Sequence, residues 1–112
     1  MLNGLAGKLE QYLDLLSARQ KLVASNIANA DTPGYQTQDI DFQTEFQNAA
    51  AGLGPHVVEA NGLPVRNDGN NVSIDRESRL LAENDLRFNI ASNLMRDKIR
   101  ILKEAINGGN GS

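Results

Sequence analysis

Three short groups of polar residues carry side chains that could do chemistry. His56 and Glu59 could form an acid–base pair, and Asp39 with Asp41 could bind a metal ion or exchange protons. Residues 68–70, Asp-Gly-Asn, have the composition of part of a calcium-binding loop. Each group predicts a site only if the neighbouring residues place the side chains as that chemistry requires.

The neighbouring residues do not place any of the three groups in that way. His56 lies among prolines and glycines with no motif that positions a nucleophile, which favours a surface histidine. Two carboxylates at i and i+2 diverge on a helix or loop, so Asp41 is better interpreted as a helix cap. If Gly69 takes the place of the calcium-loop glycine, Pro64 and Arg66 stand where carboxylates are required. No phosphate-binding glycine loop or zinc pattern is present. We therefore predict a protein that is not an enzyme, with no catalytic residue, metal site, cofactor or small-molecule substrate.

Composition excludes several further classes of protein. The 112 residues include 11 Lys and Arg against 14 Asp and Glu, a net charge of −3 that argues against nucleic acid as a partner. Cysteine is absent, which excludes disulfides and thiolate metal sites. No apolar run approaches the roughly 20 residues of a membrane-spanning helix. The N-terminus lacks a charged segment followed by an apolar one, so we expect no cleavable signal peptide.

The polar residues lie between two long segments with helical periodicity. The first, about residues 3–30, repeats apolar side chains at steps of three and four. The second, about residues 75–106, has Asp75 as a candidate N-cap and is apolar on more than one side. The side chains that we expect in helix–helix contacts, within or between subunits, are Leu9, Leu16, Val23, Ile27, Phe88, Met95, Ile99 and Leu102.

The region between the helices is predicted to be short and irregular. Asp41 can cap a short helix that has Phe42 and Phe46 on one face and ends at Gly52. Prolines and glycines interrupt residues 53–71, where only residues 56–59 could form a short strand and residues 67–71 form a turn.

We therefore predict an all-α fold: two long terminal helices packed as a coiled-coil-like hairpin, joined by a short helix and an irregular loop or short strand. We expect one structural domain. It consists of an N-terminal helix and corner (1–34), a connecting region (35–74) and a C-terminal helix and tail (75–112).

The length of the two helices indicates assembly. Each would be roughly 40–48 Å long at 1.5 Å per residue, whereas a compact globule of this size has a radius of gyration near 13 Å, by the usual scaling. The second helix carries more apolar surface than a two-helix hairpin can bury, which favours packing against other chains. A hairpin with a partly exposed face, or a compact bundle with broken helices, remains open as an alternative.

The most specific segment is residues 24–35, with the sequence ASNIANADTPGY. Thr32 precedes Pro33 and is therefore disfavoured in helical conformation, so the first helix must end by about residue 31. Pro33 and Gly34 fit the central positions of a type II turn, in which the glycine takes a positive φ. Asn26 and Asn29 share one face of the last helical turn and can bond its free carbonyls or the returning chain. These local preferences alone describe an ordinary helix stop.

The same segment resembles the A-N-x-x-N-x-x-T-P-G-Y/F signature of the flagellar rod and hook family. The matching residues, which we take as the candidate site, are Asn26, Asn29, Thr32, Pro33, Gly34 and Tyr35. Residues 36–42, QTQDIDF, and residues 69–77, GNNVSIDRE, further resemble the flagellar basal-body rod proteins of the FlgB type. The resemblance covers most of the chain apart from residues 53–68.

This resemblance implies a structural subunit of the proximal rod in the flagellar basal body. Such a subunit is exported without a cleavable signal peptide and polymerises through its terminal helices into a torque-transmitting tube in the periplasm. The implied partners are copies of itself, other flagellar rod proteins, and the rod-junction, MS-ring and export-gate proteins. A helical-hairpin subunit or adaptor of another type III secretion apparatus is the alternative. It would share the two helices and the missing signal peptide, but it would not require the Asn-Asn-Thr-Pro-Gly-Tyr corner.

Overall fold

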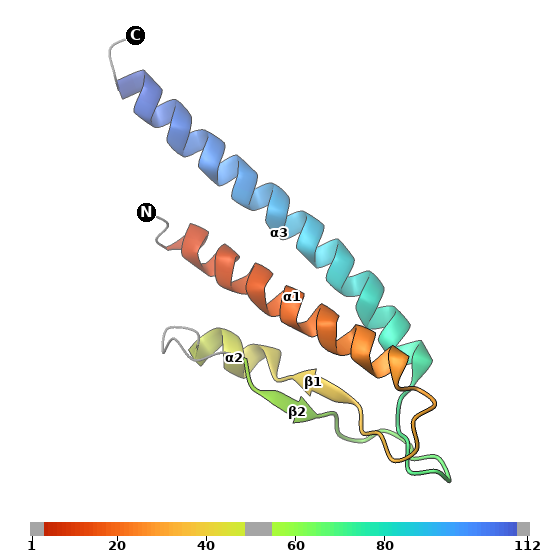
Figure 1. Cartoon of the computed structure of the whole chain (residues 1–112). Helices are drawn as coiled ribbons and strands as arrows, with labels where there is room; N and C mark the ends of the chain where they lie inside the picture. Colours follow the sequence, from red (N-terminus) through yellow and green to blue (C-terminus); the bar gives the residue numbers. More distant parts are fainter. Residues whose placement is uncertain (1–3, 49–54, 110–112) are drawn as a thin grey trace.

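The computed structural model describes residues 4–48 and 55–109 (Figure 1). The elements follow the order α1 (Leu5–Ala28), β1 (Gln38–Ile40), α2 (Phe42–Asn48), β2 (Val57–Glu59) and α3 (Ile74–Gly109). The predicted all-α hairpin of two long terminal helices is confirmed, with the short helix and a small sheet between them.

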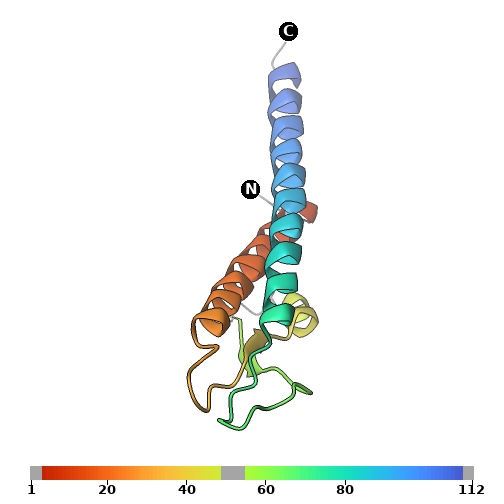
Figure 2. The same ribbon diagram turned by 90° about the vertical axis from the view of Figure 1, so that its right-hand side faces the viewer.

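The elements form three layers, with α1 in the middle (Figures 1 and 2). Helix α3 runs antiparallel along one side of α1, while α2 and the two strands lie against the other side. The molecule measures 70 × 27 × 17 Å and has a radius of gyration of 18.4 Å. A compact chain of this length would have about 13 Å, so the long helices do extend the molecule beyond a globule.

The apolar core follows the two faces of α1. Leu9, Leu16 and Val23 are buried at steps of seven, and Ala91 is buried on α3. This spacing places one seam of α1 along α3, as in a coiled coil. Leu15 and Ile40 are also buried, and β1 and α2 pack against α1. The middle helix is thus enclosed on two sides, whereas α3 is covered on one.

The connecting region contains a two-stranded sheet of which only one strand was expected. In the antiparallel pair β1–β2, Gln38 lies opposite Glu59 and Ile40 lies opposite Val57. Strand β2 falls within the predicted residues 56–59. Strand β1 was not predicted because three residues are too few to show an alternating pattern, and its partner is distant in the chain.

The helix ends differ in part from the sequence prediction. The prediction that Asp75 caps α3 is wrong: Asp75 lies inside the first turn, and Ser73 is the cap, since its Oγ accepts a hydrogen bond from Arg76 N at 3.2 Å. Asp41 does cap α2, because its Oδ1 accepts a hydrogen bond from Thr44 N at 3.4 Å. The expected end of α2 at Gly52 lies outside the described residues.

Candidate functional site

The chain leaves α1 through a tight turn formed by the predicted corner residues. Asn29 is the C-cap of α1, and its Nδ2 donates to the carbonyl of Ser25 at 2.9 Å. Tyr35 N then donates to Thr32 O at 3.2 Å, and Gly34 has φ 76°. This hydrogen bond and the positive φ are those of a type II turn with Pro33 and Gly34 in its centre.

The loop before α3 docks into this turn. Asn70 is fully buried, and its Nδ2 donates to Asn29 O at 2.9 Å and to Thr32 O at 2.8 Å. Gly34 N donates to Asp68 O at 2.8 Å. Asn71 accepts a hydrogen bond from Thr37 N at 2.6 Å through its Oδ1. The turn after α1 and the loop before α3 are therefore joined by hydrogen bonds that satisfy backbone groups of both segments.

Asn26 is the centre of the corner. It is fully buried, and its Nδ2 donates to Gln38 O at 2.8 Å and to Glu77 Oε1 at 2.6 Å. Its Oδ1 accepts from Gln38 N at 3.0 Å and from the hydroxyl of Tyr35 at 2.9 Å. One amide thus joins α1, β1 and α3. The hydroxyl of Tyr35 thus has its hydrogen-bond partner within the chain.

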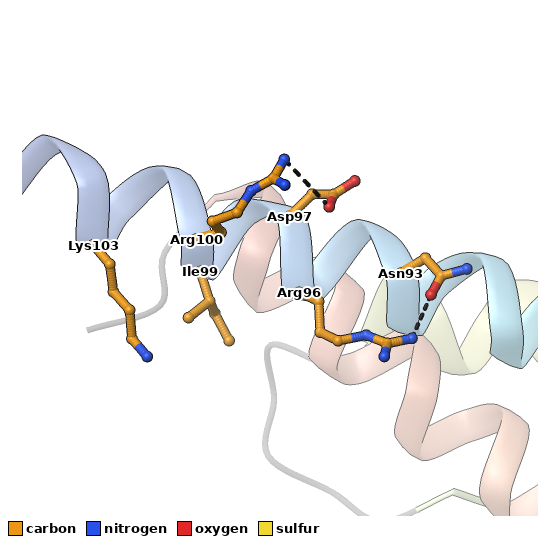
Figure 3. Close-up of a pocket in the computed structure, with 6 residues that line it drawn as sticks. All are labelled: Asn93, Arg96, Asp97, Ile99, Arg100 and Lys103. Atoms are coloured by element: carbon orange, nitrogen blue, oxygen red, sulfur yellow. Dashed lines mark hydrogen bonds and ion pairs between the residues drawn. The ribbon is translucent and has the colours of Figure 1, made fainter.

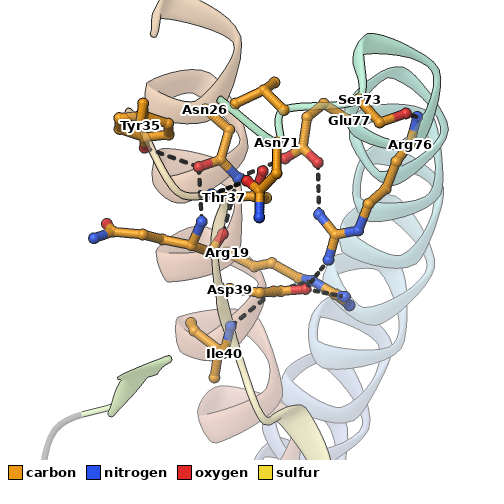
Figure 4. Close-up of polar contacts among 12 residues, drawn as sticks. Arg19, Asn26, Tyr35, Thr37, Asp39, Ile40, Asn71, Ser73, Arg76 and Glu77 are labelled. Carbon is orange, nitrogen blue, oxygen red and sulfur yellow. Dashed lines mark hydrogen bonds and ion pairs between the residues drawn. The ribbon is translucent and has the colours of Figure 1, made fainter. Parts of the chain in front are cut away.

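Four charged side chains continue the network from Asn26 (Figure 4). Arg19 of α1 makes two hydrogen bonds of 3.0 Å to the carboxylate of Asp39 in β1. Arg76 of α3 bridges Asp39 Oδ2 and Glu77 Oε2, each at 2.5 Å. The cluster contains two positive and two negative charges, so its charges are mutually compensated although Glu77 is fully buried.

The partners also shift the ionisation of two members of this cluster. Burial alone raises the pKa of Asp39, but the hydrogen bonds from Arg19, Ile40 N and Arg76 outweigh it, so the pKa lies below the ordinary 3.8. Burial lowers the pKa of Arg76, but the carboxylates of Glu77 and Asp39 outweigh it and raise the pKa above its usual value. Both groups therefore stay charged near neutral pH.

Several residues of this network were not connected with the corner from the sequence. They are Arg19, Asp39, Asn70, Asn71, Arg76 and Glu77. The string GNNVSIDRE contains four of them and was the one available signal. No local pattern pairs Asn26 with Glu77, since 51 positions separate them.

His56, which was considered for acid–base chemistry, lies apart from the corner. His56 pairs with Glu45 rather than Glu59: its backbone N and ring Nδ1 each lie 2.8 Å from Glu45 Oε1. The hydrogen bond from His56 N is the main cause that lowers the pKa of Glu45. Among residues 4–48 and 55–109, no three His, Asp or Glu side chains are grouped so that they could hold a metal ion. No helix in these ranges is sufficiently long and apolar to cross a membrane.

The predicted helix-contact residues divide into two sets. Leu9, Leu16 and Val23 are buried against α3, and Met95 is half-buried. The remaining predicted residues, which are 36–40% exposed in the single chain, are Ile27, Phe88, Ile99 and Leu102. From residue 96 onward, α3 extends past α1, and every side chain up to residue 108 is exposed except the half-buried Lys98. We call residues 96–109 the overhang.

A shallow concave surface at the start of the overhang is formed by α3 alone (Figure 3). Its lining residues all come from α3: Asn93, Arg96, Asp97, Ile99, Arg100 and Lys103. A binding pocket for a small molecule usually encloses its ligand between several elements. This surface is therefore a helix face and not a candidate active site.

The corner and the helix before it carry the likeness to known proteins. Residues 13–36, from within α1 through the turn, match the family described as "Flagella basal body rod protein". The chain is 31% identical to the flagellar basal body rod protein FlgB of Escherichia coli, over 90% of this chain and 91% of that protein. The chain belongs to the FlgB family of flagellar basal body rod proteins. The FlgB protein of Yersinia enterocolitica is 31% identical over 97% of this chain and all of its own length. That of Salmonella typhimurium is 29% identical over 90% and 91%. This family consists of structural proteins and is not an enzyme family.

Proposed function

We propose that this chain is a structural subunit of the flagellar basal-body rod, which polymerises through its terminal helices. The observation that carries the proposal is the overhang of α3. Its exposed apolar side chains, Ile99, Ile101, Leu102 and Ile106, have no covering helix among the described residues. An exposed apolar stripe on a helix indicates a contact with another chain.

The corner gives the subunit a fixed shape for this assembly. Because Asn26 and the ion pairs join α1, β1 and α3 at one end, the two long helices leave the corner with a defined direction. The seam of Leu9, Leu16 and Val23 then holds them side by side. Helix pairs of this kind can form the inner layer of a tube and transmit torque through many apolar contacts.

The family further suggests where the subunit acts and with what. We propose that it lies in the periplasmic part of the rod after type III export without a cleaved signal peptide. Copies of itself, other rod proteins, and the rod-junction, MS-ring and export-gate proteins are its proposed neighbours. The residues proposed for assembly are Ile27, Phe88, Met95, Ile99 and Leu102 together with the buried seam.

Complementation of an Escherichia coli strain that lacks its own FlgB tests the function. The unchanged chain, produced in that strain, is expected to restore swimming and the recovery of complete rods from purified basal bodies. Leu102→Asp places a charge on the overhang without touching the corner, and is expected to abolish both. Val65→Asp is the matched control, because Val65 is an exposed apolar residue of the loop before α3. Equal swimming of the Leu102→Asp and Val65→Asp strains would contradict the proposal.

A further inference from the structure

A hollow between α1 and α3 contains a buried polar atom that has no partner in the described parts of the chain. The hollow has a volume of about 240 Å³ and is lined by Leu16, Ser17, Gln20, Asn84, Asp85 and Phe88. Asn84 is 3% exposed, and its Nδ2 donates to Gln20 Oε1 at 3.3 Å. Its Oδ1 accepts no hydrogen bond from any residue that the structure describes. A buried acceptor is normally paired, and the hollow beside this oxygen leaves room for a donor from outside the chain.

The surface of α3 beside this hollow is apolar and acidic. Leu81, Asp85 and Phe88 stand at i, i+4 and i+7, which places them on one side of the helix. Leu81 is 39% and Phe88 40% exposed. Asp85 is also exposed, and within the described parts of the chain it has no ion-pair partner. The donor that fits here carries a positive charge between two apolar groups.

The overhang presents this arrangement with the opposite charge. Ile99, Lys103 and Ile106 also stand at i, i+4 and i+7, and all three are exposed. Figure 3 shows Ile99 and Lys103 projecting from the same side of α3. Lys103 has no ion-pair partner in residues 4–48 and 55–109. Apolar residues at this spacing, with a charged residue between them, are typical of a seam between two helices.

The two surfaces cannot meet within one chain. They lie on the same straight helix, displaced by five turns or about 27 Å at 1.5 Å per residue. A whole number of turns places both surfaces on the same side of α3. When two copies lie parallel and one is shifted by that distance, the three positions of one surface face the three positions of the other.

We propose that the α1–α3 hollow receives the overhang of a second copy of this chain in parallel orientation. The partner's Lys103 donates to Asn84 Oδ1 and pairs with Asp85. The partner's Ile99 packs on Leu81, and the partner's Ile106 packs on Phe88. Each copy keeps its own overhang free for the next one, so the contact is heterologous and open-ended. The proposal rests on the proposed function and names one contact by which the subunits join.

Disulfide cross-linking tests both the contact and its direction, since the chain has no native cysteine. A chain with Ile99→Cys is mixed under mild oxidation with a chain carrying Leu81→Cys, and a covalent heterodimer is expected. Phe88→Cys replaces Leu81→Cys in the matched control. It has nearly the same exposure on the same helix side, and it would face Ile99 only if the two copies were antiparallel. A chain with both Leu81→Cys and Ile99→Cys is expected to give a ladder of covalent oligomers.

Charge reversal tests the predicted partners of Lys103. Lys103→Glu is expected to abolish the heterodimer, and the combination of Lys103→Glu in one chain with Asp85→Lys in the other is expected to restore it. Lys98→Glu is the control, because it makes the same charge change about 140° around the helix and is expected to leave cross-linking unchanged.

Cross-linking of Ile99→Cys with Phe88→Cys instead of Leu81→Cys, or with neither, would overturn the proposal. Failure of the rod function is a separate result. If the unchanged chain restores swimming but the Leu81→Cys and Ile99→Cys chains do not cross-link, this contact is wrong and the function stands. If they cross-link as expected but the unchanged chain restores no rods, the contact stands and the function is wrong.

Discussion

The buried hydrogen bond between Asn26 and Glu77 is expected to be a main source of stability of the corner. Asn26→Ala would remove the donor that lies 2.6 Å from Glu77 Oε1 and leave a fully buried carboxylate with Arg76 as its remaining partner. A hydrogen bond to a charged group contributes about 1.5–3 kcal/mol. The other three bonds of Asn26 involve Tyr35 and Gln38, where water can partly replace the amide, and add about 1 kcal/mol together. We therefore expect a loss of about 2.5–4 kcal/mol.

A double-mutant cycle separates this bond from the other effects of each substitution. Urea unfolding, followed by circular dichroism, would give the free energies of unfolding of Asn26→Ala, Glu77→Ala and the double variant. Glu77→Ala removes the charge as well as the bond, so the double variant should be more stable than the sum of the single losses predicts. The expected coupling is about 1.5–3 kcal/mol, since contacting residues that share a network are not additive.

The control is Asn61→Ala, which removes an exposed amide that makes no hydrogen bond among the described residues. Its expected effect is within about 0.5 kcal/mol, as for other surface positions. If the Asn26→Ala and Glu77→Ala losses add to within about 0.5 kcal/mol, the two side chains are not coupled. The corner would then be an ordinary helix stop, and the stabilising network inferred from the Asn26–Glu77 hydrogen bond would be refuted.

Other perturbations test other parts of the same structure. Gly34→Val should cost roughly 1–3 kcal/mol in the free energy of unfolding and Gly34→Asn clearly less, because φ is +76° while a Cβ would meet no atom within 4 Å; equal losses would contradict this. Leu16→Ala should cost about 2–5 kcal/mol and Leu102→Ala less than about 0.5, since Leu16 is buried and Leu102 is 40% exposed in the single chain. The stabilisation from Asp39 should be complete above its ordinary pKa of 3.8 and be lost as the pH falls through its lowered folded-state pKa. In the Asp39→Asn variant, the free energy of unfolding should therefore depend less on pH in that acidic range. Among the amides of the two long helices in dilute protein, exchange should be fastest within residues 96–109, and protection there equal to that of Leu16 would argue against an uncovered overhang.

The long helices could be predicted from the sequence because their periodicity extends over many turns. Their ends could be predicted less well. The first helix begins at Leu5, after Gly4 with φ 56°, and ends at Ala28, slightly inside the predicted range. Ser73 was missed as the cap of α3 because Asp75 has an equally suitable side chain two positions later. Capping residues are common, and only tertiary contacts decide which one is used.

The polar network could not be predicted because it depends on contacts between distant segments. Asp39 was considered only together with Asp41, yet it binds Arg19 and Arg76, which belong to two different helices. Asn70 was interpreted as part of a turn, although it is fully buried against the end of α1. The sequence of residues 67–71 is equally compatible with an exposed turn and with a loop packed against the end of α1. Asn70 becomes buried only once α1 and α3 lie side by side.

The two ends of the molecule differ in how many of their side chains find a partner within the chain. At the corner, the fully buried Asn26, Asn70 and Glu77 all have hydrogen-bond partners from other elements of the same chain. The hydroxyl of the buried Thr37 is the exception there among the described residues. At the overhang, by contrast, the apolar side chains are exposed and Lys103 has no ion-pair partner among the described residues. Substitutions at the corner should therefore lower the stability of the single chain. Those at the overhang should leave that stability nearly unchanged and act on assembly. A variant such as Leu102→Asp that unfolds the single chain as strongly as Asn26→Ala would show that the overhang is already packed within the subunit.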